Sequence, residues 1–368
     1  MHDTESFAVR PAWAWTGEAL VRAPVLAWAD GVWTPDARGL PVHDLPGLIL
    51  PGLVNAHTHL ELGATPTPTR EGIIPWVGAL RAGPPPSGAQ ARLGAALAWS
   101  FGTALVGDVT NTGASAALLE EGPLAGVAFL EVLGIDRTAP PEGPFSPHAP
   151  HSTHPALVRE AARRARAIPE GRWTVHCDED PEERAFLAGH AGRWPAVMRA
   201  IGRDLTAFPP PGCTPVEHLR RLGVLSRHAL LVHLTLTRGA DLDTVAESGA
   251  HAVLCPRSNL HITGALPDAE GLHARGVPLA LGTDSLASCP DLDVLAEAAA
   301  ARAAFPGVPV TAWARALTRG GAHALGRTEH GQIEGATAPL LHVQVPDSDD
   351  VLERLLDGTR WPRRWVGA

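Results

Sequence analysis

The sequence predicts an α/β fold, a (β/α)8 TIM barrel with β segments at both chain termini. Three observations lead to this prediction. Between about residues 53 and 325, apolar strand-like runs alternate with helical runs rich in Ala, Leu and Arg. The two ends of the chain carry short β-like runs instead. Several apolar runs of the middle segment end in His or Asp, as expected where catalytic groups follow barrel strands.

The two terminal segments are expected to be rich in β structure. Within residues 1–52, runs such as "FAVRPAWAW" and "PVLAWADGVW" are broken by Gly, Pro and Asp and lack helical periodicity. Residues 326–368 return to β character in "GQIEGATAPLLHVQV" and are expected to add strands to the first segment. The barrel is therefore predicted for residues 53–325.

Eight apolar runs supply the predicted barrel strands. In chain order they are "PGLVNAHTH", "GTALVGDVTN", "GVAFLEVLG", "PFSPHAPH", "RWTVHCDED", "HALLVHLTL", "AHAVLCPRSN" and "GVPLALGTDS". Four units of roughly 30 residues separate the first run from the fifth, which suits a barrel of about 250 residues. The long stretch between the fifth and sixth runs is attributed to the Pro-rich insertion at 208–218.

Composition narrows the class of protein. The chain has 368 residues, of which 45% are hydrophobic and 19% charged, with a formal net charge of −9. These values suit a soluble globular protein and give no basic footprint for nucleic acid. No apolar run reaches membrane-spanning length, the N-terminus "MHDTESF" lacks the positive charge of a signal peptide, and four scattered cysteines form no C-x-x-C pair. We therefore expect a cytoplasmic protein.

Two histidines one residue apart, His57 and His59, raise the question of a metal site. Side chains alternate along a strand, so both imidazoles should lie on one face. A lone pair of this kind is equally compatible with hydrogen-bonded core histidines. Three further runs end in His176, His233 and Asp284. Because the carboxyl ends of barrel strands meet at one face, the joint pattern favours a metal site.

The chain contains no lysine, so all 30 basic residues are arginine. This absence excludes a Schiff-base lysine, a lysine-anchored pyridoxal phosphate, a P-loop lysine and a lysine-derived bridging metal ligand.

The motifs "PGLVNAHTH", "VHCDE", "LLVHL" and "LGTDS" resemble those of the amidohydrolase superfamily, the metal-dependent (β/α)8 hydrolases. The resemblance implies that the terminal β segments form a small β-sandwich domain built from both chain termini. Binuclear members bridge two metals with a carbamylated lysine, so the resemblance implies the mononuclear branch for a chain without lysine. It implies one divalent metal ion per chain, with Zn²⁺ favoured and Fe²⁺ as the alternative. The implied ligands are His57, His59, His176 and Asp284.

The same resemblance implies the roles of the catalytic residues. Glu179, three residues after His176, matches a His-x-x-Glu of deaminases and would pass protons to a ring nitrogen and to the departing ammonia. The other interpretation of Glu179 is an idle member of the acidic loop "DEDPEE". Asp284 would also accept a proton from the attacking water. His233 would orient that water or stabilise developing charge, or else serve as a fifth ligand.

Four residues are candidate substrate contacts, each with a structural alternative. His148 would bind a ribose hydroxyl, or lie at the surface of a Pro-rich loop. Glu61 would support the metal site or touch substrate. Arg257 would bind an anionic substrate tail, or form a salt bridge on the barrel rim. Trp76 would stack on a base, or pack a lid.

The expected function is hydrolytic deamination of an adenine nucleoside. "HTHLE", "PRSN" and "LGTDSLAS" most resemble deaminases that convert 6-aminodeoxyfutalosine to futalosine and ammonia in menaquinone biosynthesis. The alternatives are adenosine, methylthioadenosine or S-adenosylhomocysteine as substrate, or the chemistry of a chlorohydrolase or cyclic-amide hydrolase of the same superfamily. The expected partner is the small nucleoside, with no nucleic acid and no membrane, and a homodimer is the assembly considered.

Overall fold

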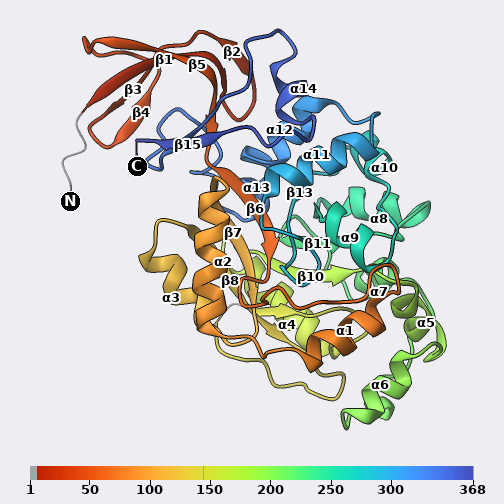
Figure 1. Cartoon of the computed structure of the whole chain (residues 1–368). Helices are drawn as coiled ribbons and strands as arrows, with labels where there is room; N and C mark the ends of the chain where they lie inside the picture. The colour runs from red at the N-terminus through yellow and green to blue at the C-terminus, as the bar shows by residue number, and fades with distance from the viewer. Residues whose placement is uncertain (1–5, 144, 368) are drawn as a thin grey trace.

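The computed structural model describes residues 6–143 and 145–367 (Figure 1). Pro144, the first residue of the fourth expected strand, and the acidic residues 1–5 lie outside the described part. Each of the eight expected runs contains a strand at its predicted place. These strands are β6 (Leu53–Thr58), β7 (Thr103–Thr110), β8 (Ala125–Val132), β9 (Phe145–Pro147), β10 (Trp173–Cys177), β11 (Ala229–His233), β12 (His251–Leu254) and β13 (Leu279–Leu281).

The eight strands form a closed TIM barrel, as predicted. Parallel pairing gives two sheets in the orders β6-β7-β8-β9 and β10-β11-β12-β13. The sheets meet where β9 contacts β10 and where β13 contacts β6, with a parallel bridge between Thr58 and Asp284. Gly282 permits this closure, because a Cβ there would lie 2.7 Å from the backbone oxygen of His57.

Helices cover the outside of the barrel and account for most of the long connections. In chain order they are α1 (Ile73–Ala82), α2 (Gly88–Ser100), α3 (Ala114–Glu121), α4 (Pro155–Arg166), α5 (Pro181–Gly189), α6 (Trp194–Ala200), the 3₁₀ helix η1 (Leu205–Ala207), α7 (Pro215–Arg221), α8 (Ala240–Ser248), α9 (Pro256–Ile262), α10 (Ala269–Ala274), α11 (Val294–Ala304), α12 (Val310–Ala316) and α13 (Arg319–Ala324). The described residues between β8 and β9 contain no helix.

The long connection between β10 and β11 differs from its expected form. We attributed its extra length to the Pro-rich stretch 208–218, but α5, α6 and η1 occupy most of the residues before that stretch. The extra length therefore builds a helical excursion beside the barrel, which Figure 1 shows in green.

Strands from both chain ends form one seven-stranded sheet outside the barrel. It contains β1 (Phe7–Trp15), β2 (Leu20–Arg22), β3 (Leu26–Ala29), β4 (Val32–Thr34), β5 (Val42–Pro51), β14 (Leu340–Val343) and β15 (Arg363–Val366), in the order β15-β14-β5-β1-β3-β4 with β2 paired to β1. The short helix α14 (Val351–Leu355) lies between β14 and β15. The β domain expected from both termini is this sheet. We propose residues 1–52, 53–325 and 326–368 as the domain segments.

Apolar side chains fill the barrel interior and leave its carboxyl end for polar groups. Inward residues such as Val54, Leu105, Phe129 and Val232 form one buried cluster, which Leu325 after α13 joins. In the described part of the chain, no helix combines the length and apolarity needed to cross a membrane.

Candidate active site

Three histidines meet at the carboxyl ends of β6 and β10. His57 and His59 come from the end of β6, and their ring centroids lie 5.0 Å apart. His176 comes from β10, and its Nε2 lies 3.2 Å from Nε2 of His59. The Nδ1 of His176 faces the carbonyl oxygen of His148 at 2.7 Å, so that nitrogen donates and Nε2 is left without a proton. All three side chains are buried.

Asp284, three residues after the end of β13, completes this group. Its Oδ1 lies 3.6 Å from Nε2 of both His57 and His59. Its Oδ2 accepts hydrogen bonds from the hydroxyls of Ser258 and Ser288, each at 2.7 Å. Burial alone would raise the pKa of Asp284, but the imidazoles of His57, His59 and His233 outweigh it and hold that pKa well below its usual value. Asp284 is therefore a carboxylate with one oxygen fixed and one facing the histidines.

The backbone turns sharply at two of the predicted site residues. His233 has a φ of 75° and Asp284 a φ of 58°, a left-handed conformation uncommon for residues other than glycine. Alternation along β11 places Leu230 and Val232 in the barrel interior, so alternation alone would turn His233 outward. The left-handed turn allows His233 to face the cavity instead, at the cost of backbone strain that is common at functional sites.

Glu179 and His233 form a second pair beside the histidine cluster. The Oε1 of Glu179 lies 3.7 Å from Nε2 of His233. Burial, followed by the charge of Asp284, raises the pKa of Glu179 well above its usual value. The amide nitrogen of Asn259 lies 3.1 Å from Nδ1 of His233 and donates to it. The surroundings of Glu179 therefore favour its protonated form more strongly than bulk water does.

The buried nitrogens of the cluster fit a metal ion. The ligand atoms of His57, His59 and His176 lie within 4.8 Å of one another. Among the described residues, both ring nitrogens of His57 and Nδ1 of His59 are buried without a hydrogen-bond partner. Buried polar atoms without partners are costly, and a metal ion would satisfy one nitrogen of each ring that coordinates it. Three imidazoles with one carboxylate match the usual ligands of zinc.

The cluster lies at the floor of a cavity of about 680 Å³. His59, His176, His233, Glu179 and Asp284 line its floor. Apolar side chains of α1, α6 and neighbouring segments line the rest, together with Arg81 and Arg203, and the main ones are Leu62, Ile73, Trp76, Val77, Leu80, Leu133, Val197, Met198 and Ile201. The cavity therefore has a polar end and a wider apolar end.

Two of the four candidate substrate contacts line this cavity. The indole of Trp76 is buried, and its Nε1 donates to the carbonyl of Ala287 at 3.1 Å. Trp76 therefore both packs a wall and faces the cavity. The Nδ1 of His148 lies 2.6 Å from the hydroxyl of Ser152, and burial lowers the pKa of His148 to about 4. A neutral imidazole thus faces the cavity beside His176.

Glu61 is not among the residues that line the cavity. The expected contact between Glu61 and the substrate is therefore corrected. Its Oε1 accepts from the hydroxyls of Thr110 and Thr112, and its Oε2 accepts from the backbone N–H groups of Asn111 and Thr112 at 3.1 Å. Both carboxylate oxygens are thus engaged by the loop after β7. Glu61 supports that loop from beneath the cavity.

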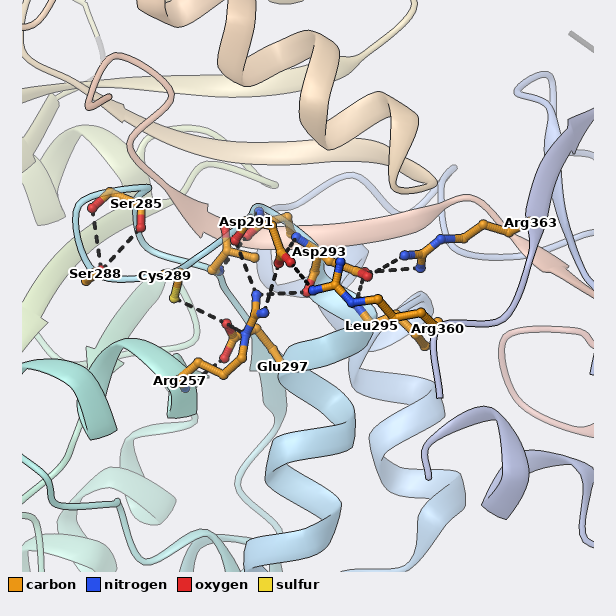
Figure 2. Close-up of polar contacts among 12 residues, drawn as sticks. Arg257, Ser285, Ser288, Cys289, Asp291, Asp293, Leu295, Glu297, Arg360 and Arg363 are labelled. Atoms are coloured by element: carbon orange, nitrogen blue, oxygen red, sulfur yellow. Dashed lines mark hydrogen bonds and ion pairs between the residues drawn. The ribbon is translucent and has the colours of Figure 1, made fainter. Parts of the chain in front are cut away.

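Arg257 is likewise turned away from the cavity, and the expected contact with an anionic substrate tail is corrected. Its Nε lies 2.6 Å from Oε1 of Glu297, and its Nη1 lies 2.8 Å from Oδ1 of Asp291. Its Nη2 donates to the carbonyl oxygens of Asp291 and Asp293. Figure 2 shows the guanidinium held between these carboxylates. The alternative weighed from the sequence, a salt bridge of the barrel, describes its position.

Several cavity or site residues were missed from the sequence. Glu131 ends β8, lines the cavity and accepts a 2.7 Å hydrogen bond from Asn111 on its Oε2. The run "GVAFLEVLG" already contained this signal, since Glu131 stands at the carboxyl end of a predicted strand. Ser258, Ser288 and Asn259 lie in the motifs that carried the resemblance, but their contacts with Asp284 and His233 need the fold to be seen.

A closed parallel barrel whose carboxyl end gathers histidines and an aspartate defines a metal-dependent hydrolase of the TIM-barrel class. The chain belongs to the Amidohydrolase family, whose sequence profile matches residues 142–343. It is a hydrolase acting on carbon-nitrogen bonds other than peptide bonds.

The chain is similar to several proteins named as deaminases. It is 32% identical over 315 residues to an aminodeoxyfutalosine deaminase of Deinococcus radiodurans, covering 76% of this chain and 73% of that protein. It is 28% identical over 341 residues to a 5-methylthioadenosine/S-adenosylhomocysteine deaminase of Nitratidesulfovibrio vulgaris, covering 84% of this chain and 74% of that protein. The crystal structure of Helicobacter pylori aminofutalosine deaminase with methylthio-coformycin superposes with a TM-score of 0.81 at 19% identity, covering 96% of this chain and 97% of that one, which supports the fold.

Proposed function

We propose that the chain deaminates an adenine nucleoside by hydrolysis and that its substrate is 6-aminodeoxyfutalosine, converted to futalosine and ammonia in menaquinone biosynthesis. The observation that carries the deaminase proposal is Glu179, a largely buried carboxyl group with a raised pKa that lies beside a histidine cluster fit for a metal. Departure of ammonia needs a proton donor, and a raised pKa makes this carboxyl group better able to hold and deliver a proton.

The proposed ligands of one divalent ion are His57, His59, His176 and Asp284, with Zn²⁺ favoured and Fe²⁺ as the alternative. When bound there, the ion activates a water molecule as a nucleophile at neutral pH. Asp284 is the proposed acceptor of a proton from that water. His233 is not a ligand in this proposal, because donation by Asn259 to its Nδ1 leaves the proton on Nε2, from which His233 orients the nucleophile.

Glu179 moves protons on the substrate. Its carboxyl group donates to the ring nitrogen next to the attacked carbon, which makes that carbon more electrophilic. A bond forms between this carbon and the water oxygen, and the bond to the exocyclic nitrogen breaks. A second proton, taken from the attacking water, reaches the leaving nitrogen, so that water and the amine yield a carbonyl and ammonia.

The cavity shape supports a nucleoside with a large, anionic tail. Beyond the polar floor, the apolar wall of Trp76, Val77 and Met198 offers a surface for an aromatic group. Because Arg257 is turned away from the cavity, this proposal assigns its role to Arg81 and Arg203, which line the cavity. Their positive charges would attract the carboxylate of aminodeoxyfutalosine. The Deinococcus radiodurans relative supports this substrate, whereas the Nitratidesulfovibrio vulgaris relative favours methylthioadenosine or S-adenosylhomocysteine as a second candidate.

We also propose a cytoplasmic location. The assembly considered is a homodimer of two copies of the chain. Cys177, Cys213, Cys255 and Cys289 are free thiols, which suits a reducing compartment.

The test is ammonia release by the zinc-loaded protein from 6-aminodeoxyfutalosine, methylthioadenosine, S-adenosylhomocysteine and adenosine. We expect the highest kcat/KM on 6-aminodeoxyfutalosine. A higher value on methylthioadenosine would select the second candidate. No ammonia from any of the four would contradict the deaminase proposal.

A further inference from the structure

A largely buried ionic network joins the C-terminal segment to the loop that follows Asp284. Figure 2 shows three carboxylates, Asp291, Asp293 and Glu297, paired with three arginines, Arg257, Arg360 and Arg363. Arg360 lies 2.5 Å from Oδ2 of Asp291, and Arg363 pairs with both carboxylate oxygens of Asp293. The charges balance, as burial of ionic groups requires.

This network leads directly to Asp284. The loop 285–293 carries Ser288, which donates to Oδ2 of Asp284 at 2.7 Å. The other donor to that oxygen, Ser258, is the residue after Arg257. Cys289 contacts Glu297 within the same network, with its Sγ 3.5 Å from Oε1. Both serines that hold Asp284 are therefore attached to segments that the ionic network ties together.

The far end of the network is fixed in the β domain. Arg363 is the first residue of β15 and pairs with Val343 of β14 in antiparallel register. Its side chain is 10% exposed, and its guanidinium lies over the ring of Phe101 at 5.4 Å. Its partner Asp293 also caps α11, accepting from the backbone N–H of Leu295 at 3.1 Å. The loop is thus held between a barrel helix and the outer sheet.

We propose that Arg360 and Arg363 are positioning residues for Asp284, and that the C-terminal segment serves as a clamp on the metal site. The clamp comprises Arg360 and Arg363 with Asp291 and Asp293. It holds the loop 285–293 so that Ser288 occupies one oxygen of Asp284 and leaves the other to the metal. This inference rests on the proposed metal centre. It assigns the end of the chain a part in metal binding, beyond the packing of the β domain on the barrel.

The test compares two buried arginines. Arg363→Met removes the clamp, whereas Arg172→Met removes an arginine at the opposite end of the barrel whose side chain is 6% exposed and donates to the carbonyls of His323 and Ala324. We expect both variants to lower Tm. Only Arg363→Met should weaken zinc binding, by about tenfold in chelator competition, since partners of metal ligands contribute on that scale. Arg363→Lys should recover part of the loss, because it restores the charge without the two-pronged contact.

The outcomes separate the clamp from the proposed function. Equal zinc affinity in Arg363→Met and the unsubstituted protein, or equal weakening in Arg172→Met, would overturn the clamp while leaving the metal site in place. No zinc binding by the unsubstituted protein would overturn the metal centre and the clamp with it. If Arg363→Met does not fold, Arg360→Met decides, because its side chain is 66% exposed. That variant should weaken zinc binding while keeping its fold, and unchanged affinity would overturn the proposal.

Discussion

The floor and the mouth of the cavity are built in different ways. At the floor, the polar side chains stand at or just past the carboxyl ends of barrel strands, and three of them are fixed by a neighbour: His176 by the carbonyl of His148, Asp284 by two serines, and His233 by Asn259. At the mouth, the wall comes from α1, α6 and loops, and Leu133 and Ile201 remain 41% and 40% exposed. The difference indicates that the barrel fixes the chemistry, while the added helices select the substrate.

The largest effect is expected from removing a metal ligand at the floor. His57→Ala removes one of the four proposed ligands and leaves a gap in the buried site, so metal affinity should fall by more than ~100-fold and deamination should drop to background. Metal analysis should find about one divalent ion per chain in the unsubstituted protein and none in the variant. Two tightly held ions per chain, or retention of the ion by His57→Ala, would contradict the mononuclear site.

The second-largest effect is expected at Glu179, and it distinguishes this proposed proton donor from the metal ligands at the cavity floor. Glu179→Gln keeps the shape of the side chain but cannot transfer protons, so activity should fall by ~10²–10⁴-fold while metal content stays unchanged. Glu182→Gln is the matched control, because Glu182 belongs to the same acidic stretch but pairs with Arg193 at 2.7 Å. Its activity should stay near that of the unsubstituted protein. Loss of metal from Glu179→Gln would reassign Glu179 as a ligand.

The floor was more predictable from the sequence than the mouth. Strand ends in a parallel barrel meet at one face, so His57, His59, His176, His233 and Asp284 could be brought together from their positions in apolar runs alone. No such rule places a side chain beyond the strand. Arg257 belongs to the predicted motif "CPRSN", yet its guanidinium pairs with Glu297, forty residues later in the chain, and that long-range pairing left no pattern in the sequence.

Glu61 shows the same limit at shorter range. Its identity and spacing suggested a site residue, but the threonine hydroxyls and backbone N–H groups that occupy its carboxylate come from the loop after the next strand. The helical excursion of α5 and α6 was also missed, because short helices interrupted by Pro and Gly have little periodicity. The wall of the mouth depends on that excursion, so its lining residues could not be named beforehand.

At the mouth, the expected effect is smaller and depends on the substrate. Arg81 is exposed and has no ion-pair partner in the described part of the chain, while Arg203 pairs with Asp136 at 3.2 Å. Exposed charge pairs contribute up to about 1 kcal/mol each, so Arg81→Met combined with Arg203→Met should lower kcat/KM on 6-aminodeoxyfutalosine by up to roughly 30-fold, mainly through KM. Adenosine, which has no carboxylate, should be affected little.

Arg137→Met is the control for the loss of positive charge in the double variant. Arg137 is exposed and lies outside the cavity lining, so Arg137→Met should leave both substrates unaffected. Arg257→Met should reduce activity on both substrates alike, because it removes one cation from the ionic network behind Asp284. Equal losses on both substrates in the double variant would show that the mouth does not select the carboxylate.

The smallest effect concerns His151, which lies between the floor and the mouth. Its Nδ1 is 3.6 Å from Oε1 of Glu183, its ring packs on Trp194, and burial lowers its pKa from 6.5 to about 3. As pH falls below 6.5, the unfolded chain takes up a proton that folded His151 does not, so stability should decrease between pH 6.5 and 3 and be unaffected by this group above 6.5. One such proton contributes at most about 1.4 kcal/mol per pH unit.

His151→Gln should therefore flatten the dependence of Tm on pH in acid while leaving the slope between pH 7 and 8 unchanged. An unaltered acid slope in the metal-free protein would show that this histidine is protonated in the folded chain and that the boundary of the cavity is wetter than its floor.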